Sequence, residues 1–308
     1  MARKVDSVIL ETLGLDASET RMSPHGGSGF ASTFKLSTSV DGQPCRYFIK
    51  TGRAAAAETM FRGEHASLNA IADAVPGFCP RAHAHGAMRD ASGQYFLATD
   101  FLDLSSSTSS SSRPSLAAKL AQLHTTPAPT PGGAFGFPVI TCCGATPQDN
   151  TWTTSWPEFF AERRLRAVLR ACKADAELSA AVETVAAEVV PRLLGRVEPV
   201  APVVLHGDLW SGNHGRAAGG EEVAFDPAAV YGHAEYDLGI MRMFGGFGRA
   251  FWEEYHALVP KAEPREEWED RIALYELYHH LNHLAMFGGG YRGGAMAIMK
   301  GLIEKYAG

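Results

Sequence analysis

The sequence predicts an α+β protein of two lobes, in which a small antiparallel β-sheet with one main helix precedes a larger, mostly helical part. Up to residue 104, strand-like runs alternate with turn residues. A polar stretch, "SSSTSSSSRPS", comes next and carries too little apolar surface to offset its ordering entropy. From Leu116 onward, apolar residues recur at helical spacing. We therefore expect an N-terminal lobe at 1–104, a Ser-rich linker or surface loop at 105–115 and a C-terminal lobe at 116–308.

The N-terminal lobe begins with helical periodicity over residues 4–13, which Gly14 ends. Residues 20–51 predict three strands, separated by a glycine-rich turn at 26–29 and by a "DGQP" turn. The run "AAAAETMFRGEHASLNAIADAV" is rich in helix-forming residues and has one apolar face, so it predicts the main helix. The segment "AHAHGAMRDASGQYFLATDFLD" then predicts a hairpin.

The C-terminal lobe is predicted to be helical over four runs: "LAAKLAQLH", a long run from "WPEFF" to "PRLL", "EEWEDRIALYELYHHLNHLAMF" and "AMAIMKGLIEKYA". Between them we expect only two short strands, "VVLHGD" and "EVAFD", with the second lying beside the first. Both strands end in an Asp. The polar groups at the ends of these short strands are therefore candidate functional residues.

Charge and composition narrow the class of partner. The chain has 28 basic and 34 acidic residues, a net charge of −6, which favours neither nucleic acid nor anionic membrane as a partner. No stretch reaches the roughly 18 apolar residues of a membrane span, and the N-terminus does not resemble a secretory signal. Five cysteines without C-x-x-C spacing suggest reduced thiols. We expect a cytoplasmic protein with a small-molecule partner, and the oligomeric state stays open.

The segment "HGDLWSGN" carries the strongest chemical signal. Four residues separate Asp208 from Asn213, which is the spacing of the catalytic base and the metal-binding Asn in the catalytic loop of protein kinases. Asp226, thirteen residues after Asn213, could supply the second metal carboxylate. Any one of these groups could be an ordinary turn residue. The ordered set instead favours phosphoryl transfer by a two-lobed, protein-kinase-like fold that uses ATP and Mg²⁺.

A phosphate-positioning pair is expected in the first lobe. Lys50 ends an apolar strand, and Glu64 lies fourteen residues later in the predicted helix. A Lys and Glu pair between strand and helix positions the phosphates in protein kinases. Taken singly, each residue reads as a solvated charge, and only the order of the elements favours the functional interpretation.

Two further segments are candidates for the nucleotide site. The loop "PHGGSGFAST" could lay its amides over phosphates, although any hairpin also needs such glycines, and it lacks a Walker ending. The backbone at the end of "ATDFL" could face an adenine edge, although an ordinary edge strand looks the same. The candidate residues are Gly27, Ser28, Gly29, Asp100, Phe101 and Leu102.

Longer stretches of the chain resemble one family. Four segments resemble the corresponding sequences of the fructosamine kinases (ketosamine 3-kinases), and the resemblance extends over about residues 5–305. These segments are "FGFPVITCCGATPQDNTWTTSWPEFFAERRL", "HGDLWSGN", "FDPAAVYGHAEYDLGIMRMFGGF" and "LYELYHHLNHL". That family is similar in fold to aminoglycoside phosphotransferases and protein kinases. The resemblance implies ATP-dependent phosphorylation of the sugar 3-hydroxyl of fructosamine or ribulosamine adducts on lysine or protein amines, which leads to deglycation.

The resemblance also implies a role for each matched residue. Asp208 would be the base, Asn213 and Asp226 the Mg²⁺ ligands, and Lys50 with Glu64 the phosphate-positioning pair. One other enzyme class remains open besides the ketosamine kinase, namely a kinase of another small alcohol such as an aminoglycoside or choline. A nucleotide-binding regulator without catalysis is the third possibility, although no member of the catalytic set is missing.

Substrate contacts are expected from three side chains. Trp210 could stack on a sugar or lysyl stem, or could simply pack the loop. His233, in "YGHAEYDLG", could bind hydroxyls, whereas Asp237 in the same segment is expected to cap the next helix or brace the catalytic loop. His283 could close the sugar pocket.

The helix that carries His283 leaves two further points open. His279 and His283 lie four residues apart, a spacing that could also hold zinc, but no acidic ligand is evident nearby. The family text there would read "NHLNHFG", whereas this chain has Ala285 and Met286 in the second polar pair. We therefore expect substrate selectivity to differ if that pair touches substrate.

Overall fold

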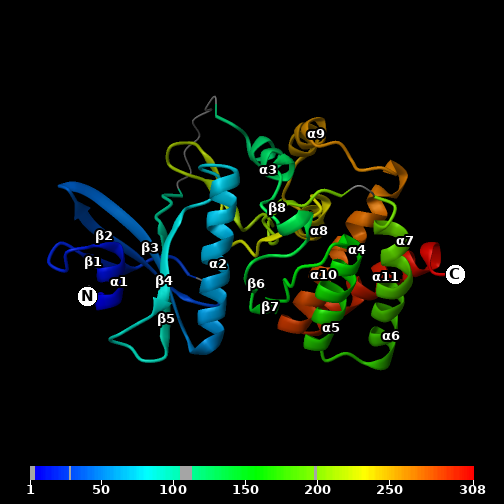
Figure 1. Ribbon diagram of the computed structural model, residues 1–308, viewed down its shortest axis with the longest axis horizontal. Coiled ribbons are helices and arrows are strands. Elements are labelled where there is room, and N and C mark those ends of the chain that lie inside the picture. The colour runs from blue at the N-terminus through cyan, green and yellow to red at the C-terminus, as the bar shows by residue number, and fades with distance from the viewer. Residues whose placement is uncertain (1–3, 28, 105–112, 198–199) are drawn as a thin grey trace.

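The computed structural model describes residues 4–27, 29–104, 113–197 and 200–308. Figure 1 shows the β-sheet of the N-terminal lobe at one end of the molecule and the helices of the C-terminal lobe at the other, with helix α2 next to the boundary between them. Ser28 and most of the Ser-rich segment lie outside the described residues. The domain limits therefore stay a prediction, while the α+β class is confirmed.

The N-terminal lobe is one antiparallel sheet with strand order β1-β2-β3-β5-β4. The strands are β1 (Arg21–Pro24), β2 (Ser32–Val40), β3 (Gln43–Arg53), β4 (Ala82–Ala87) and β5 (Gln94–Asp100). In the register of this sheet, Lys50 on central strand β3 lies opposite Thr33 on β2 and Leu97 on β5. Because β3 pairs with a strand on each side, the Lys50 backbone is held in place and fixes the origin of its side chain.

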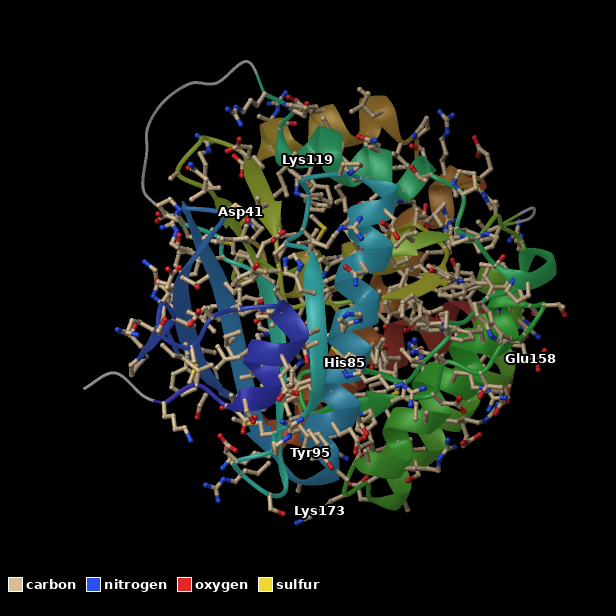
Figure 2. All side chains as sticks on the ribbon, turned by 60° about the vertical axis from the view of Figure 1, so that its left-hand side comes forward. Asp41, His85, Tyr95, Lys119, Glu158 and Lys173 are labelled. Carbon is tan, nitrogen blue, oxygen red and sulfur yellow. The ribbon has the colours of Figure 1, made fainter. Side chains whose placement is uncertain are left out.

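Two helices accompany the sheet. Helix α1 (Ser7–Leu13) ends at Gly14, whose φ of 66° is left-handed, as the sequence predicts. Helix α2 (Ala54–Ala74) packs against β4 and β5, and the ring centroid of His65 on α2 lies 4.8 Å from that of His85 on β4 (Figure 2). Its buried side includes Glu64, so the helix carries this carboxylate toward the boundary between the lobes.

Helix α2 is also fixed to the C-terminal lobe. The Ser67 hydroxyl donates to the Gly63 carbonyl oxygen at 2.8 Å and accepts the Ala229 backbone N–H at 3.1 Å. A Cβ on Gly63 would come within 2.6 Å of the Ile140 carbonyl oxygen, so only glycine permits this close approach. The helix therefore contacts both lobes.

A second tie between the lobes is made by Lys119 (Figure 2), which is almost fully buried. Its Nζ donates to the Gly77 carbonyl oxygen at 2.8 Å, after α2, and to the Glu222 carbonyl oxygen at 2.6 Å. Burial lowers the pKa of this ammonium, and the two carbonyl oxygens replace part of its hydration. The tie joins the N-terminal lobe to the strand that leads to Asp226.

The C-terminal lobe is mostly helical, as expected. Its α-helices are α3 (Leu116–Thr125), α4 (Trp156–Phe159), α5 (Ala167–Ala171), α6 (Ala176–Thr184), α7 (Val190–Leu194), α8 (Glu235–Phe244), α9 (Arg249–Leu258), α10 (Trp268–Phe287) and α11 (Arg292–Tyr306). Wider π-type turns at Phe160–Arg166 and Val185–Val189 continue α4 into α5 and α6 into α7. Asp175 caps α6 by accepting the Leu178 N–H, so the long predicted run divides there.

Short strand pairs connect these helices. They are β6 (Thr141–Cys143) with β7 (Thr146–Gln148), β8 (Val203–Leu205) with β11 (Val230–Gly232), and β9 (His214–Arg216) with β10 (Glu222–Ala224). The expectation of only two strands, lying beside each other, was wrong, because the predicted pair β8 and β10 each joins a different partner. Strands of three residues are too short for alternation to be detected in the sequence.

The core of the C-terminal lobe contains large aromatic and aliphatic side chains. Trp156, Phe160, Tyr236 and Tyr275 form a cluster with ring centroids 5.1 to 6.4 Å apart. Such close rings hold α4, α8 and α10 together. Across the described part of the chain, none of the helices combines the length and the apolar character that crossing a membrane requires.

Candidate active site

The loop after β8 is held in place by a carboxylate from α8. Asp237 accepts the backbone N–H of His206 through Oδ2 and that of Gly207 through Oδ1, each at 2.7 Å. Gly207 has a φ of 79°, and a Cβ there would lie 2.0 Å from the Ala228 carbonyl oxygen. This position therefore requires glycine, and the loop turns sharply before Asp208.

Asp237 is itself fixed by a buried histidine. His124 Nε2 lies 3.1 Å from Asp237 Oδ2, and His124 Nδ1 lies 2.7 Å from the Tyr255 hydroxyl. Burial alone would raise the pKa of Asp237, but the hydrogen bond from His124 and the nearby charges lower it overall. Asp237 lies in the first turn of α8 and points back at the loop, so it acts as the brace that the sequence allowed and not as a cap of that helix.

His206 has a structural role in the same loop. Its Nε2 lies 3.1 Å from the Phe225 carbonyl oxygen, and its Nδ1 accepts the Asp208 backbone N–H at 3.3 Å. Burial lowers the pKa of His206 to about 4, so the imidazole is neutral and carries its proton on Nε2, facing the carbonyl. The ring thus links the residue before Asp226 to the backbone of Asp208.

Asp208 and Asn213 meet across the turn. Asn213 Nδ2 donates to the Asp208 backbone oxygen at 2.9 Å and contacts its Oδ2 at 3.3 Å. The other carboxylate oxygen, Oδ1, lies 3.7 Å from Cys143 Sγ. Burial, followed by the negative charge of Asp226, raises the pKa of Asp208 to about 8. A carboxyl group whose pKa lies this close to neutrality can exchange a proton at physiological pH.

Lys50 lies between two carboxylates. Its Nζ is 2.7 Å from Glu64 Oε1 and 2.6 Å from Asp226 Oδ1. Burial alone would lower the pKa of Lys50, but the charges of Glu64 and Asp226 raise it, so the ammonium is retained. Asp226 has a left-handed φ of 56°, an uncommon conformation for a residue other than glycine. The sequence-predicted pair is thus formed, and Asp226 joins it.

The donor groups of this site suit a hard cation. Asn213 and Asp226 line one cavity together with Asp208, and their side chains offer amide and carboxylate oxygens, the ligands that Mg²⁺ prefers. Asn213 directs Nδ2 toward Asp208, which leaves its oxygen as the group available to a cation. About half of the Asp226 side chain is exposed, so the carboxylate is open to the cavity. The residues present therefore fit a magnesium ion.

Two neighbouring cavities share Gly27, Lys50, Glu64, Phe225 and Asp226. The inner one, of about 240 Å³, is also lined by His25, Gly26, Thr33, Phe48, Leu68, Pro80, Thr99, Asp100, Leu102 and Leu104. The outer one, of about 380 Å³, is also lined by Gly29, Phe30, Ala31, Met60, Cys142, Gly144, Asp208, Trp210, Gly212, Asn213 and Pro227. A hollow of about 760 Å³ elsewhere on α2 holds none of the predicted site residues.

The candidate nucleotide residues divide between these cavities. Gly27, Asp100 and Leu102 line the inner one, and Gly29 lines the outer one. Phe101 instead stacks near His25, with ring centroids 4.9 Å apart. The Asp100 carboxylate is engaged by His83 at 2.7 Å, so only the backbone of this segment remains for a base edge.

Trp210 reaches the outer cavity, with 37% of its surface exposed. Its ring lies 5.4 Å from that of Phe244, and Phe244 lies 5.2 Å from His283 on α10. A Cβ on Gly212 would lie 2.2 Å from the indole, so glycine there allows the ring to fold back over the loop. His283 is therefore connected to the cavity through two aromatic rings.

His233 lies in the interior. It is 8% exposed, and its Nδ1 is 2.8 Å from the Tyr275 hydroxyl, which also accepts the Trp156 indole N–H at 2.9 Å. These contacts make His233 part of the aromatic core, and it lines neither of the two cavities. We therefore do not propose it as a substrate contact.

The chain is similar to known proteins along almost its whole length. The sequence profile of the fructosamine kinase family matches residues 1–305. The chain belongs to the fructosamine kinase family. The mouse ketosamine-3-kinase is 35% identical over 94% of this chain and 97% of its own length. The chloroplastic protein-ribulosamine 3-kinase of Arabidopsis thaliana is 33% identical over 97% of this chain and 88% of its own length. The resemblance stated from the sequence is thereby confirmed.

Solved structures agree with the fold of a fructosamine kinase. A protein of Thermobifida fusca assigned to fructosamine-3-kinase superposes with a TM-score of 0.78 at 27% identity, covering 97% of this chain and 99% of that one. The aminoglycoside phosphotransferase APH(4)-Ia, in a ternary complex with AMP-PNP and hygromycin B, gives a TM-score of 0.61 at 13% identity, covering 97% and 98%. This second likeness shows the protein-kinase-like fold alone. Membership in a kinase family implies ATP as the phosphoryl donor.

Proposed function

We propose that this chain is an ATP-dependent ketosamine 3-kinase, which phosphorylates the sugar 3-hydroxyl of fructosamine or ribulosamine adducts on lysine or protein amines and so leads to their removal. The observation that carries the proposal is the convergence of Lys50, Glu64, Asp208, Asn213 and Asp226 on the walls of two adjoining cavities, in a chain of this family.

Asp208 is proposed as the catalytic base. It lies on the outer cavity, and its raised pKa suits it to accept the hydroxyl proton. Asp237 and His206 fix the backbone on either side of the turn, so the carboxylate is positioned before substrate arrives. Asn213, through its contacts with the backbone oxygen and Oδ2 of Asp208, helps to fix the position of this carboxylate.

The nucleotide is proposed to occupy the inner cavity, with its phosphates toward the outer one. Asn213 and Asp226 would hold Mg²⁺, which supplies charge neutralisation of the phosphates when bound. Lys50, which the two cavities share, would meet a phosphate oxygen while Glu64 keeps its ammonium in place. Gly27 lines both cavities and Gly29 lines the outer one, and we propose that their backbone amides approach the phosphates.

The ketoamine is proposed to bind in the outer cavity. Trp210 offers an apolar face for the sugar ring or the lysyl stem next to Asp208. His283 supports the indole from α10 through Phe244, so it is a positioning residue.

Cytoplasmic location stays a prediction, since the Arabidopsis relative is named as chloroplastic.

A turnover panel tests this function. ATP consumption is measured with fructosyl-lysine, ribulosyl-lysine, choline and kanamycin under identical conditions, with product phosphorylation followed by mass spectrometry. We expect turnover on at least one ketoamine and none on choline or kanamycin. Absence of turnover on both ketoamines would overturn the assignment, and turnover on choline or kanamycin alone would indicate a kinase of another small alcohol. Nucleotide binding without any turnover would indicate a regulator.

A further inference from the structure

A second polar cluster includes Asp208, through an oxygen other than the one that Asn213 contacts. It consists of Cys143 on β6, His279 on α10 and the carboxylate of Asp208, whose ligand atoms all lie within 4.8 Å of one another. Cys143 and His279 are fully buried. Asp208 thus faces Asn213 with Oδ2 and Cys143 with Oδ1. The two carboxylate oxygens of Asp208 therefore contact different residues.

His279 is the unusual member of this cluster. Its exposure is 0%, and among the described residues neither of its ring nitrogens has a hydrogen-bond partner. A buried imidazole without a partner is costly, because each polar nitrogen loses its water without a replacement. Burial lowers the pKa of His279 to about 3, so the ring is neutral and has a lone pair available for a metal. The Oδ1 atom of the neighbouring Asn282 also has no partner within the described part of the chain, while its Nδ2 donates to the Cys143 carbonyl oxygen at 3.2 Å.

The spacing in the cluster matches that of metal ligands. Zinc bonds of about 2.3 Å to sulfur and about 2.0 Å to oxygen, at a tetrahedral angle, separate the two ligand atoms by about 3.5 Å. Cys143 Sγ and Asp208 Oδ1 are 3.7 Å apart. A His279 nitrogen lies within 4.8 Å of both other ligand atoms, so three different kinds of donor come together here.

From this geometry we propose that Cys143, Asp208 and His279 form an inhibitory site for a soft divalent cation of the Zn²⁺ type. Thiolate and imidazole ligands select such a cation over Mg²⁺, which prefers oxygen. Occupancy engages Asp208 Oδ1 and removes the base from catalysis, so this inhibitory role rests on the proposed kinase function. Without a cation, burial keeps the pKa of the Cys143 thiol well above its ordinary value, and the incoming cation displaces the thiol proton to solvent.

Binding is tested first without nucleotide or substrate. Co²⁺ is titrated into the full chain, and the thiolate-to-cobalt charge-transfer band is followed, then displaced with Zn²⁺. We expect one equivalent to bind to the wild type. Cys143→Ser should abolish the band, and His279→Gln should weaken cobalt and zinc binding by at least about tenfold. The matched control is Cys142→Ser, because Cys142 lies on the same strand but faces the outer cavity and is outside the cluster.

Inhibition is tested next, with ketoamine and saturating Mg²⁺ and ATP. We expect Zn²⁺ to reduce turnover of wild type and Cys142→Ser, with the inhibitory concentration raised at least about tenfold in His279→Gln. Denaturation midpoints measured without metal show whether each variant is folded. If Cys143→Ser does not fold, the test of the site rests on His279→Gln. Three results for the cobalt charge-transfer band would overturn the site. They are absence of the band in the wild type, its presence in both Cys143→Ser and His279→Gln at wild-type strength, and its loss in Cys142→Ser. Metal binding without any ketoamine turnover would instead count against the proposed kinase.

Discussion

Asp237 accepts the Gly207 backbone N–H at 2.7 Å, from a helix that begins 28 residues after Gly207. The same carboxylate holds the preceding N–H of His206, so two buried donors depend on one side chain. The conformation of the loop that carries Asp208 is therefore set by a residue that lines neither of the two cavities. Its contribution can be separated from chemistry by substitution.

We expect Asp237→Asn to loosen the loop. An amide has one acceptor oxygen where the carboxylate has two, so one backbone N–H loses its partner, at a cost of about 1–3 kcal/mol. Turnover should fall at least about tenfold, because Asp208 is no longer held in place. Turnover and the urea denaturation midpoint measure both effects. Asp41→Asn, at an exposed turn between β2 and β3 (Figure 2), is the control and should change neither.

Asp208→Asn tests the base itself. Asparagine keeps the size of the side chain and can still contact Asn213, but it cannot accept the hydroxyl proton. We expect phosphoryl transfer to be nearly abolished while ATP affinity, measured by calorimetry, and the denaturation midpoint are largely kept. Unchanged turnover would remove Asp208 from the mechanism.

Lys50→Met should destabilise the chain by about 3–5 kcal/mol, because Glu64 is buried and would lose its counter-charge. The double variant Lys50→Met with Glu64→Leu should recover most of that stability without recovering turnover, since apolar residues can replace a buried ion pair but cannot bind a phosphate. Denaturation midpoints and turnover distinguish the two effects. Recovery of turnover in the double variant would show that the pair has no role beyond stability.

Trp210→Ala should act on the ketoamine and not on ATP. Aromatic contacts of this kind contribute about 0.5–1.5 kcal/mol, so the KM for the ketoamine should rise roughly two- to tenfold, with the KM for ATP unchanged. Initial rates over both substrates give the two constants. Trp252→Phe, whose indole N–H donates to Phe247 away from the cavities, is the matched control. Equal changes in both constants would favour a packing role for Trp210.

Mild acid should destabilise the fold. Burial lowers the pKa of His206 and His233 to about 4, and that of His279 to about 3, from an ordinary value of 6.5. Below pH 6.5 the unfolded chain takes up these protons and the folded chain does not, so stability falls between about pH 6.5 and 4. His233→Gln should reduce this slope by up to about 1.4 kcal/mol per pH unit. An unaltered slope would show that His233 titrates normally.

Much of the fold follows from local patterning. The N-terminal strands, α2 and the long helices were predicted because each contains enough residues for its periodicity to emerge. The residues of the candidate site were predicted because they are close in sequence or occur in a known order. Helix α9 was not, since it follows "GGFG" and no side chain caps its start.

The rest depends on contacts between distant residues. His124, which contacts both Asp237 and Tyr255, lies more than a hundred residues before either of them in sequence, so no spacing could reveal these contacts. His233 lies in a segment full of polar residues, and only the three-dimensional structure shows that its ring faces Tyr275 in the core. Cys143 and His279 likewise meet only through the packing of β6 against α10.

Helix α2 touches the C-terminal lobe through Ser67 and Gly63, one turn or less from Glu64. In many protein kinases, activity is switched by displacing the corresponding helix and parting its Glu from the Lys. Here such a displacement would break the Ser67 contact to Ala229 and open the close packing of Gly63 on Ile140. The contacts of Ser67 and Gly63 thus help to hold Glu64 against Lys50, and any outward movement of the helix would first have to break them.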